Sequence, residues 1–171
     1  QEHFKYNASD LANNQLTDAQ KAYGTSVDTP AVNELNQADD MTNPVAAWKG
    51  GTLALKDRVA VQVTIEVPSL DGITIEMTVN GKTLVYEADR LTPVTGKVNR
   101  YTLEVRDLAV YEMRDAATFV VKQNGQRISK TLTYSIQSYA ATNANSTVPG
   151  LANLLKAMLR YGDAAKAYAT K

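Results

Sequence analysis

Residues 59–67 read Val-Ala-Val-Gln-Val-Thr-Ile-Glu-Val, and every odd-numbered position in this stretch is apolar. Successive side chains of a β-strand point to opposite faces, so this alternation collects the apolar side chains on one face. The even-numbered positions carry Ala60, Gln62, Thr64 and Glu66. The pattern predicts a strand with one buried face and one solvated face.

The alternation returns after a Pro68–Gly72 connection, at residues 73–79, which read Ile-Thr-Ile-Glu-Met-Thr-Val. The next dipeptide, Asn80-Gly81, predicts a two-residue hairpin because both central positions of a type I′ turn need a positive φ. Such a turn fixes the register of the two strands that it joins. We therefore expect the pairs Met77–Leu84 and Ile75–Tyr86 on the inner face and Glu76–Val85 on the other face.

Further strands are predicted at residues 100–105, 109–113, 118–123 and 126–134, with Asn124-Gly125 as a second hairpin turn. About seven short strands with turns at near-regular spacing predict a mainly β fold, an antiparallel β-sandwich of the immunoglobulin-like type. We expect the sandwich to cover residues 52–134. Residues 25–51 contain Asp, Asn, Thr, Pro and Gly throughout and are expected to form an irregular connection.

Both ends of the chain are expected to be helical. In residues 135–171, apolar side chains recur at helical spacing at Leu151, Leu154, Leu155, Met158 and Leu159, and Ala165 and Tyr168 extend the pattern. We expect this amphipathic C-terminal segment to pack on the sandwich. Ser146 or Thr147 is expected to cap the helix. Gly162 interrupts it at a cost of about 1 kcal/mol relative to Ala, which calls for a packing reason. Residues 1–24 form a predicted helical lead-in, where Thr17 and Gln20 have the spacing of a capping box.

Composition excludes several classes of function. The chain has 171 residues, 18 Lys and Arg against 18 Asp and Glu, no Cys and one His. A neutral chain lacks the basic surface that nucleic-acid binding requires. The sequence contains no run of 18 apolar residues, so it predicts no membrane-spanning segment. Without Cys and with a single His, neither thiol catalysis nor a Cys-based zinc site is possible. We therefore expect no enzyme, no cofactor and no metal site.

The C-terminal third resembles a known family. Residues 134–140 read Tyr-Ser-Ile-Gln-Ser-Tyr-Ala, and residues 154–165 read Leu-Leu-Lys-Ala-Met-Leu-Arg-Tyr-Gly-Asp-Ala-Ala. This resembles the YSIxSYA … LLKAMLxYGDAAxxY ending of repeat modules in very large secreted or cell-surface proteins of gut Firmicutes. Residues 1–7, Gln-Glu-His-Phe-Lys-Tyr-Asn, are similar to the segment that continues this helix into the next module. Residues 1–24 are thus expected to include the tail of a preceding module.

The resemblance implies a non-catalytic module at the bacterial cell surface or outside the cell, with neighbouring modules in the same chain. Some large proteins of this kind bind polysaccharide, and others resemble superantigen-like binders of immunoglobulin variable domains. The expected function is therefore contact with a host protein such as immunoglobulin. A structural spacer in a tandem array and a carbohydrate-binding module are the alternatives. The family motif is a core helix, so it brings no catalytic residues to this chain.

Four residues are candidates for binding a ligand. Trp48, the only tryptophan, precedes Gly50-Gly51 in the predicted connection. An exposed indole there would stack on a sugar or anchor a protein, whereas a buried one would close the core. Tyr111 is the tyrosine that we most expect to be exposed, and Glu112 and Arg114 lie beside it.

Carboxylates suggest two further sites. Two strand carboxylates about 5–9 Å apart would suit a glycosidase, but a solvated sheet face is the simpler interpretation; the residues are Glu66, Glu76, Glu87 and Glu104. Asp39 and Asp40, with Glu34 and Asn36, carry oxygens suited to Ca²⁺, although their spacing matches no EF-hand loop.

Overall fold

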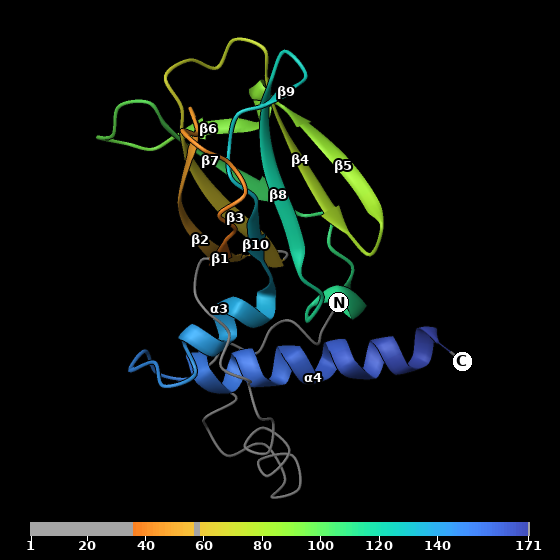
Figure 1. Ribbon diagram of the computed structural model, residues 1–171. Coiled ribbons are helices and arrows are strands. Elements are labelled where there is room, and N and C mark those ends of the chain that lie inside the picture. Colours follow the sequence, from red (N-terminus) through yellow and green to blue (C-terminus); the bar gives the residue numbers. More distant parts are fainter. Residues whose placement is uncertain (1–35, 57–58, 171) are drawn as a thin grey trace, which may run out of the picture. The chain divides into compact units, whose positions relative to one another are not determined.

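The computed structural model describes residues 36–56 and 59–170, in two compact units (Figure 1). Residues 36–108 and 115–136 belong to a β unit, and residues 109–114 and 137–170 belong to a helical unit. The predicted helical lead-in at residues 1–24 lies outside the described residues. The mainly β prediction with a C-terminal helix is confirmed.

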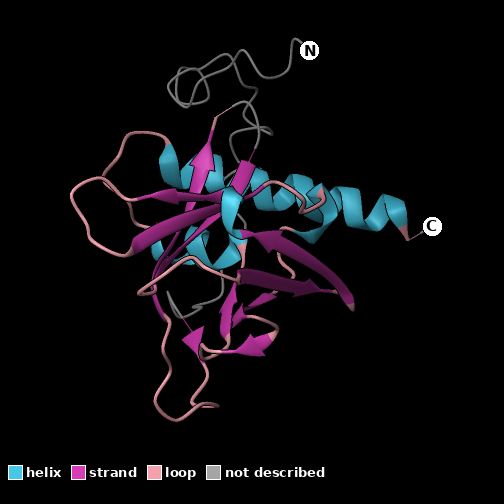
Figure 2. Ribbon diagram, turned by 90° about the horizontal axis from the view of Figure 1, so that it is seen from above, coloured by secondary structure: helices cyan, strands magenta, loops and turns pink. Residues whose placement is uncertain are grey.

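The β unit contains two antiparallel sheets (Figures 1 and 2). The strands of the first sheet are, in spatial order, β1 (Asn36–Gln37), β10 (Leu132–Tyr134), β8 (Ala117–Gln123), β4 (Ile73–Val79) and β5 (Lys82–Glu87), and β9 (Gln126–Arg127) also pairs with β8. The second sheet has the order β2 (Ala47–Leu55), β3 (Val59–Glu66), β7 (Arg100–Val105) and β6 (Leu91–Pro93). A short 3-10 helix, η2 (Ala88–Arg90), joins β5 to β6.

The hairpin between β4 and β5 has the predicted register, with Ile75 opposite Tyr86, Glu76 opposite Val85 and Met77 opposite Leu84. Its turn residues Asn80 and Gly81 have φ values of 49° and 77°. Both lie in the left-handed region that a type I′ turn requires. The second predicted turn, Asn124-Gly125, has φ values of 50° and 81° and joins β8 to β9.

The core lies between the sheets and is built from the alternating apolar residues. Val61, Val63, Ile65 and Val67 are buried in and just after β3. The inward positions of β4 are buried in the same way; they are Ile73, Ile75, Met77 and Val79. Across the core, the ring of Trp48 on β2 meets the ring of Phe119 on β8 edge-on, with centroids 6.2 Å apart. The two sheets therefore share one set of packed side chains.

Strand β2 begins at Ala47. The prediction that residues 47–51 belong to an irregular connection is therefore wrong. The register shifts between Trp48 and Gly50, which leaves Lys49 without an opposing residue on β3. This bulge breaks the period of two by which a strand is recognised in sequence. A Cβ on Gly51 would lie 2.7 Å from the ring of Tyr134, so a larger residue would displace that ring.

Two other strand predictions also differ from the structure. Residues 109–113 form no strand, and Val110–Glu112 is instead a 3-10 helix, η3. Residues 126–134 are divided into β9 and β10, because the ladder with β8 is interrupted at Ser129. The Ser129 hydroxyl is buried there, accepts a hydrogen bond from the backbone N–H of Val121 at 2.8 Å and donates one to the carbonyl of Lys130 at 2.9 Å. The side chain thus replaces a missing backbone acceptor.

The segment that follows β1 is held by its two carboxylates to β9 and to the residues between β9 and β10. Asp40 accepts hydrogen bonds from the backbone N–H of Thr131 at 3.1 Å and from its hydroxyl at 2.7 Å, and it also pairs with Arg127. Asp39 pairs with Lys130 at 2.6 Å. The hydrogen bonds from Arg127 and Thr131 hold the pKa of the Asp40 carboxyl well below its usual range.

The C-terminal helices are α3 (Ile136–Thr142) and α4 (Leu151–Ala169). Neither Ser146 nor Thr147 caps α4, contrary to prediction. Gly150 occupies the N-cap position with a φ of 76°, and the Ser146 hydroxyl instead accepts a hydrogen bond from the N–H of Val148 at 3.2 Å. The expected packing of this segment on the sandwich stays a prediction.

Ser129→Ala is expected to lower the free energy of unfolding by about 1–3 kcal/mol, because it leaves the buried N–H of Val121 without its acceptor. Urea denaturation measures the change. Ser69→Ala, which removes an exposed hydroxyl bonded to Asp71, is the control and should cost less than about 0.5 kcal/mol. Equal costs for the two variants would contradict this role of Ser129.

A second prediction concerns acid. Because the pKa of Asp40 is lowered in the folded state, its contribution is complete above the unfolded pKa of about 3.9 and is lost as the pH falls below it. The difference in stability between the wild-type protein and Asp40→Asn should therefore shrink as the pH is lowered from about 5 to about 2. Urea midpoints at a series of pH values test this. Thr52→Ala, on the other sheet, should show a constant difference, and a constant difference for Asp40→Asn would refute the prediction.

Candidate functional site

Trp48 lies in the core and is 3% exposed. Its indole N–H donates a hydrogen bond to the carbonyl of Lys130 at 2.9 Å, and its ring contacts Phe119. A ring that is almost fully buried has no exposed face that a sugar or a protein partner could contact. The suggested ligand-binding role of Trp48 is therefore corrected, and the alternative interpretation, a residue of the core, describes it.

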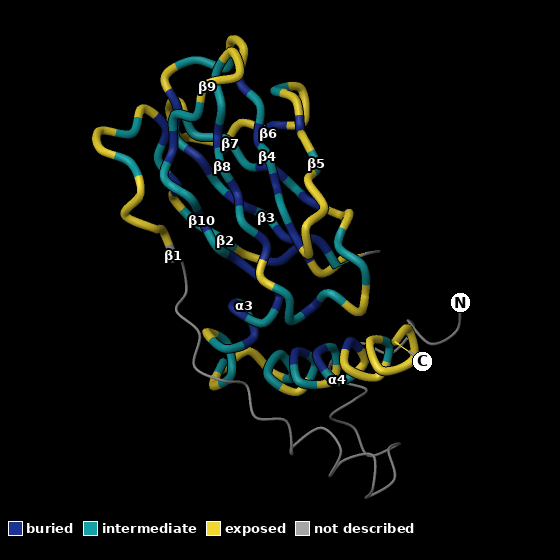
Figure 3. The backbone as a smooth tube through the Cα atoms, turned by 45° about the vertical axis from the view of Figure 1, so that its right-hand side comes forward, coloured by how far each residue is buried: buried dark blue, intermediate teal, exposed yellow. Residues whose placement is uncertain are grey.

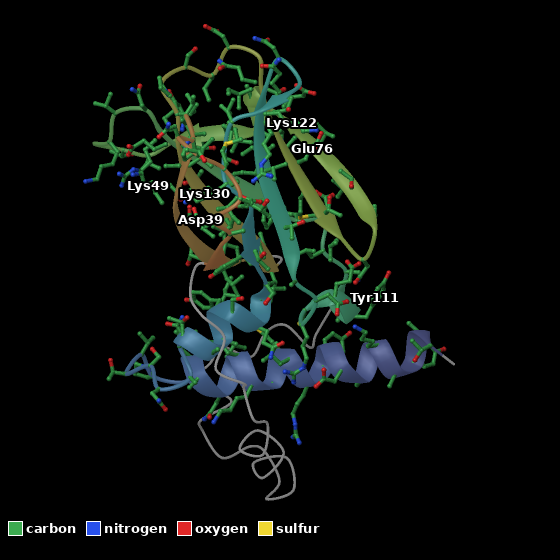
Figure 4. The ribbon with its side chains drawn as sticks, in the orientation of Figure 1. Asp39, Lys49, Glu76, Tyr111, Lys122 and Lys130 are labelled. Carbon is green, nitrogen blue, oxygen red and sulfur yellow. The ribbon has the colours of Figure 1, made fainter. Side chains whose placement is uncertain are left out.

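The other three candidates lie on or next to η3 in the helical unit. Tyr111 is 44% exposed, as predicted (Figure 4). The Glu112 carboxylate accepts a hydrogen bond from the backbone N–H of Ala109 at 2.8 Å, which stabilises the first turn of η3. Arg114 makes two hydrogen bonds to Asp163 of α4, at 2.6 and 2.8 Å, and these raise the pKa of Arg114. Glu112 and Arg114 thus hold this unit together, and Tyr111 alone of the four presents an exposed ring.

Gly162 shows why α4 and η3 pack closely. A Cβ at this position would lie 3.0 Å from the carbonyl oxygen of Val110 and 3.2 Å from Cβ of Met113. The backbone N–H of Gln137, in α3, donates to the carbonyl of Met113 at 3.1 Å. The predicted packing reason for this glycine is therefore confirmed: any side chain here would push η3 away from α4.

The β unit also presents the outer face of the first sheet, which sequence reasoning did not single out as a site. Its residues alternate with the buried positions of β4, β5, β8 and β10. Four threonines lie in one row across these strands, because Thr78 is opposite both Thr83 and Thr118, and Thr118 is opposite Thr133. We call this surface the Thr face; it consists of Thr74, Glu76, Thr78, Thr83, Val85, Glu87, Thr118, Val120, Lys122 and Thr133.

The Thr face carries few charged side chains. One of its two acids, Glu76, accepts a hydrogen bond from Lys122 at 2.6 Å, on the neighbouring strand (Figure 4). The other, Glu87, lies at the end of the edge strand β5, opposite Thr74. The hydroxyls of Thr78 and Thr83 lie 2.9 Å apart and form a hydrogen bond. Val85, on the edge strand β5, is 53% exposed. This surface combines short polar side chains with an exposed apolar residue at its edge.

The outer face of the second sheet is different, because it is covered by ion pairs. Glu66 pairs with Arg100 at 2.7 Å and with Lys49 at 3.4 Å, and the hydrogen bond from Arg100 lowers the pKa of Glu66. Glu104 pairs with Arg106 and accepts a hydrogen bond from Gln62 at 2.9 Å, and these contacts lower the pKa of Glu104. A general acid needs a raised pKa, so neither carboxylate is suited to the acid role of a glycosidase.

Metal binding finds no support in residues 36–56 and 59–170. No group of three or more His, Cys, Asp or Glu side chains in these ranges is arranged to hold an ion. Asp39 and Asp40, which were considered for Ca²⁺, are paired with Lys130 and Arg127 instead. Their suggested partner Glu34 lies outside the described residues.

Comparison of the chain with known protein families, curated proteins and solved structures found no match. Within the described part of the chain, no helix is both long enough and apolar enough to cross a membrane.

Gly162→Ala tests the contact between α4 and η3. Helix propensity alone would stabilise the variant by about 1 kcal/mol, but the added methyl must displace Val110 or Met113. We expect no net gain in the free energy of unfolding and faster hydrogen exchange at the amides of residues 110–114. Asn153→Ala, at an exposed position of the same helix, is the control for propensity. A full propensity gain at Gly162 with unchanged exchange would contradict the close contact.

Proposed function

We propose that this chain is a non-catalytic, extracellular binding module of a bacterial surface protein, and that it contacts a host protein, with immunoglobulin as the first candidate. The observation that carries the proposal is the Thr face. It extends over four strands, holds one internal ion pair and has an exposed valine at its edge. Protein interfaces of the non-obligate kind are, as a whole, only about as apolar as the rest of a protein surface, which matches this composition.

The strand order supports an immunoglobulin-like architecture for the β unit. In chain order, β2 to β8 and then β9 with β10 correspond to eight successive strands A, B, C, C′, D, E, F and G. The orders β2-β3-β7-β6 and β10-β8-β4-β5 then read A-B-E-D and G-F-C-C′. An immunoglobulin-like sandwich has its strands in these two orders. In this correspondence the Thr face is the outer surface of the G-F-C-C′ sheet.

The edge strand β5 suggests how a partner is recognised. Its outward residues Thr83 and Val85 are exposed, and Lys82 and Glu87 mark its two ends. The free backbone edge of such a strand can pair with a strand of another protein, while side chains on the sheet face select the partner. An immunoglobulin domain has strand edges of its own, so it is a suitable occupant.

The resemblance to repeat modules of gut Firmicutes surface proteins supports the extracellular setting and the presence of neighbouring modules. The carbohydrate-binding alternative is less well supported. It needs exposed aromatic rings to stack on sugars, but Trp48 is buried and the Thr face contains no aromatic residue. A structural spacer is the function that would follow if the module binds nothing.

Immobilised protein is expected to capture human IgA or IgG at micromolar concentration, and Val85→Arg should weaken capture by about tenfold or more, because it places a bulky charge on the edge strand at which the partner is proposed to pair. Thr52→Arg is the matched control, since Thr52 is exposed on β2, an edge strand of the other sheet. Surface plasmon resonance measures both.

The outcomes separate the alternatives. Absence of capture for both immunoglobulins would refute the immunoglobulin proposal. Capture that Val85→Arg leaves unchanged would exclude the Thr face as the contact surface. A parallel panel of plant glycans and mucins tests the carbohydrate alternative. Binding to neither the immunoglobulins nor the glycans would favour the spacer.

A further inference from the structure

Strand β5 is the least protected sheet edge in the described part of the chain. A free edge presents backbone N–H and C=O groups to other strands, and proteins block such pairing with short strands, proline or a bulge. The other outer strands each have one of these features: β1 and β9 have two residues, β6 has three and includes Pro93, and β2 has the bulge after Trp48. In contrast, β5 has six residues, no proline and an uninterrupted register with β4.

The register of the hairpin determines which backbone groups of β5 face outward. In an antiparallel pair, residues that exchange backbone hydrogen bonds alternate with residues that do not. The residues that flank the two-residue turn, Val79 and Lys82, form a bonded pair, and so does every second pair after them. The backbone groups of Thr83 and Val85 therefore face away from β4, as does the N–H of Glu87. Figure 3 shows that most of this strand is also exposed.

We propose that the β5 strands of two copies of this protein pair antiparallel around a twofold axis at Val85. Backbone bonds form only where outward-facing residues lie opposite one another, so odd-numbered residues of one strand must face odd-numbered residues of the other. With Val85 opposite its own counterpart, Thr83 of each copy lies opposite Glu87 of the other. The same surface is then used by both copies, as a twofold dimer requires.

The side chains of β5 are complementary to themselves in this register. Val85 is 53% exposed, and the two copies of it would form an apolar contact at the axis. On either side, the Thr83 hydroxyl would face the Glu87 carboxylate and donate a hydrogen bond to it, and such cross-strand pairs stabilise a sheet. Lys82 and Glu87 lie at opposite ends of β5, so antiparallel pairing brings the base of one copy beside the acid of the other.

The two neighbouring registers fit less well. With the axis at Leu84, Val85 lies opposite Thr83, which separates the two apolar side chains. Glu87 then has no partner on β5, because it lies opposite the turn. With the axis at Tyr86, Val85 lies opposite Glu87, which sets a carboxylate against an apolar side chain. The register centred on Val85 alone joins apolar to apolar and donor to acceptor.

The dimer has a consequence for the Thr face. A twofold axis perpendicular to the sheet keeps the Thr faces of both copies on the same side, where they would form one continuous surface across the two β5 strands. The dimer would also cover the edge at which a partner's strand is proposed to pair, so the two complexes would exclude each other. The pairing of two copies itself does not depend on the proposed contact with immunoglobulin.

Sedimentation velocity of the purified protein alone tests for the dimer. The contact involves six residues from each copy, fewer than the roughly 20–30 of a standard interface, so the association should be weak. We expect monomers at low micromolar concentration and dimers as the concentration approaches millimolar. A protein that stays monomeric over this range would overturn the proposal and leave the immunoglobulin proposal untouched, because capture of immunoglobulin is measured separately.

Charges at the axis test the register. Val85→Lys and Val85→Asp should each weaken the dimer by about fivefold or more, because each sets like charges opposite one another. An equal mixture of the two variants should recover the association as a mixed dimer, after circular dichroism has confirmed that each variant is folded. Thr52→Lys, exposed on the edge strand β2 of the other sheet, is the control and should leave the dimer unchanged. A mixture of folded variants that does not recover the dimer would exclude an axis at Val85.

Cysteine crosslinking tests the same register without introducing a charge, since the chain has no cysteine of its own. Val85→Cys should form an interchain disulfide readily under mild oxidation, because opposite residues of an antiparallel pair have Cα atoms about 4.5–5.5 Å apart. Thr83→Cys should react more slowly, because its two copies would lie roughly 13 Å apart along the strands. Non-reducing electrophoresis measures both rates. Equal rates, or a faster reaction of Thr83→Cys, would overturn the proposed axis.

Discussion

The contact between Trp48 and Phe119 is the interaction on which the β unit depends. It joins β2 of one sheet to β8 of the other, and the indole N–H adds a hydrogen bond to the carbonyl of Lys130. An edge-on pair of rings stabilises a core by about 0.5–1.5 kcal/mol beyond its buried area. Nearby features accommodate this side chain. After the bulge at Lys49, strand β2 continues its pairing with β3, and the absence of a side chain at Gly51 leaves room for the ring of Tyr134. The break in the ladder at Ser129 lies next to Lys130, the residue that accepts the indole N–H.

The side chains of the core come from the inner faces of the two sheets. The residues on the outer faces can therefore differ from one sheet to the other. One carries Glu66 and Glu104 in ion pairs with arginine, and the other carries a row of threonines. Exposed ion pairs of this kind contribute little to stability, and a threonine row contributes mainly β propensity and cross-strand contacts. Stability therefore does not require the difference between the faces. The proposed contact with a partner would give a reason for a surface that is polar, with few charges, and apolar at one edge.

The sequence predicted those parts of the fold that are determined locally. The alternation in β3 and β4 depends on residues within each strand, and the turn at Asn80-Gly81 joins β4 to β5 in the register that was predicted. The start of β2 was missed because the bulge and two glycines hide the alternation. Residues 109–113 resemble a strand in composition, but contacts with α4, distant in sequence, accompany a 3-10 helix there. The Thr face was only partly predictable, since Thr78 and Thr83 share a hairpin whereas Thr118 and Thr133 join the row through long-range pairing. Trp48 shows why binding residues were harder to predict than strands. A tryptophan is suited both to ligand binding and to the core, and only its burial in the structure distinguishes the two roles.

The residues behind the family resemblance can be explained one by one by packing within the helical unit. In the stretch Tyr161-Gly162-Asp163-Ala164, Gly162 allows η3 to approach and Asp163 binds Arg114 through both carboxylate oxygens. Tyr161 and Ala164 are exposed instead. Gly162 and Asp163 thus serve the packing of this helix on η3, whatever the module binds. Such a motif identifies a way of folding and not a ligand, which is why a search for the function must begin at the Thr face of the β unit and not at the motif itself.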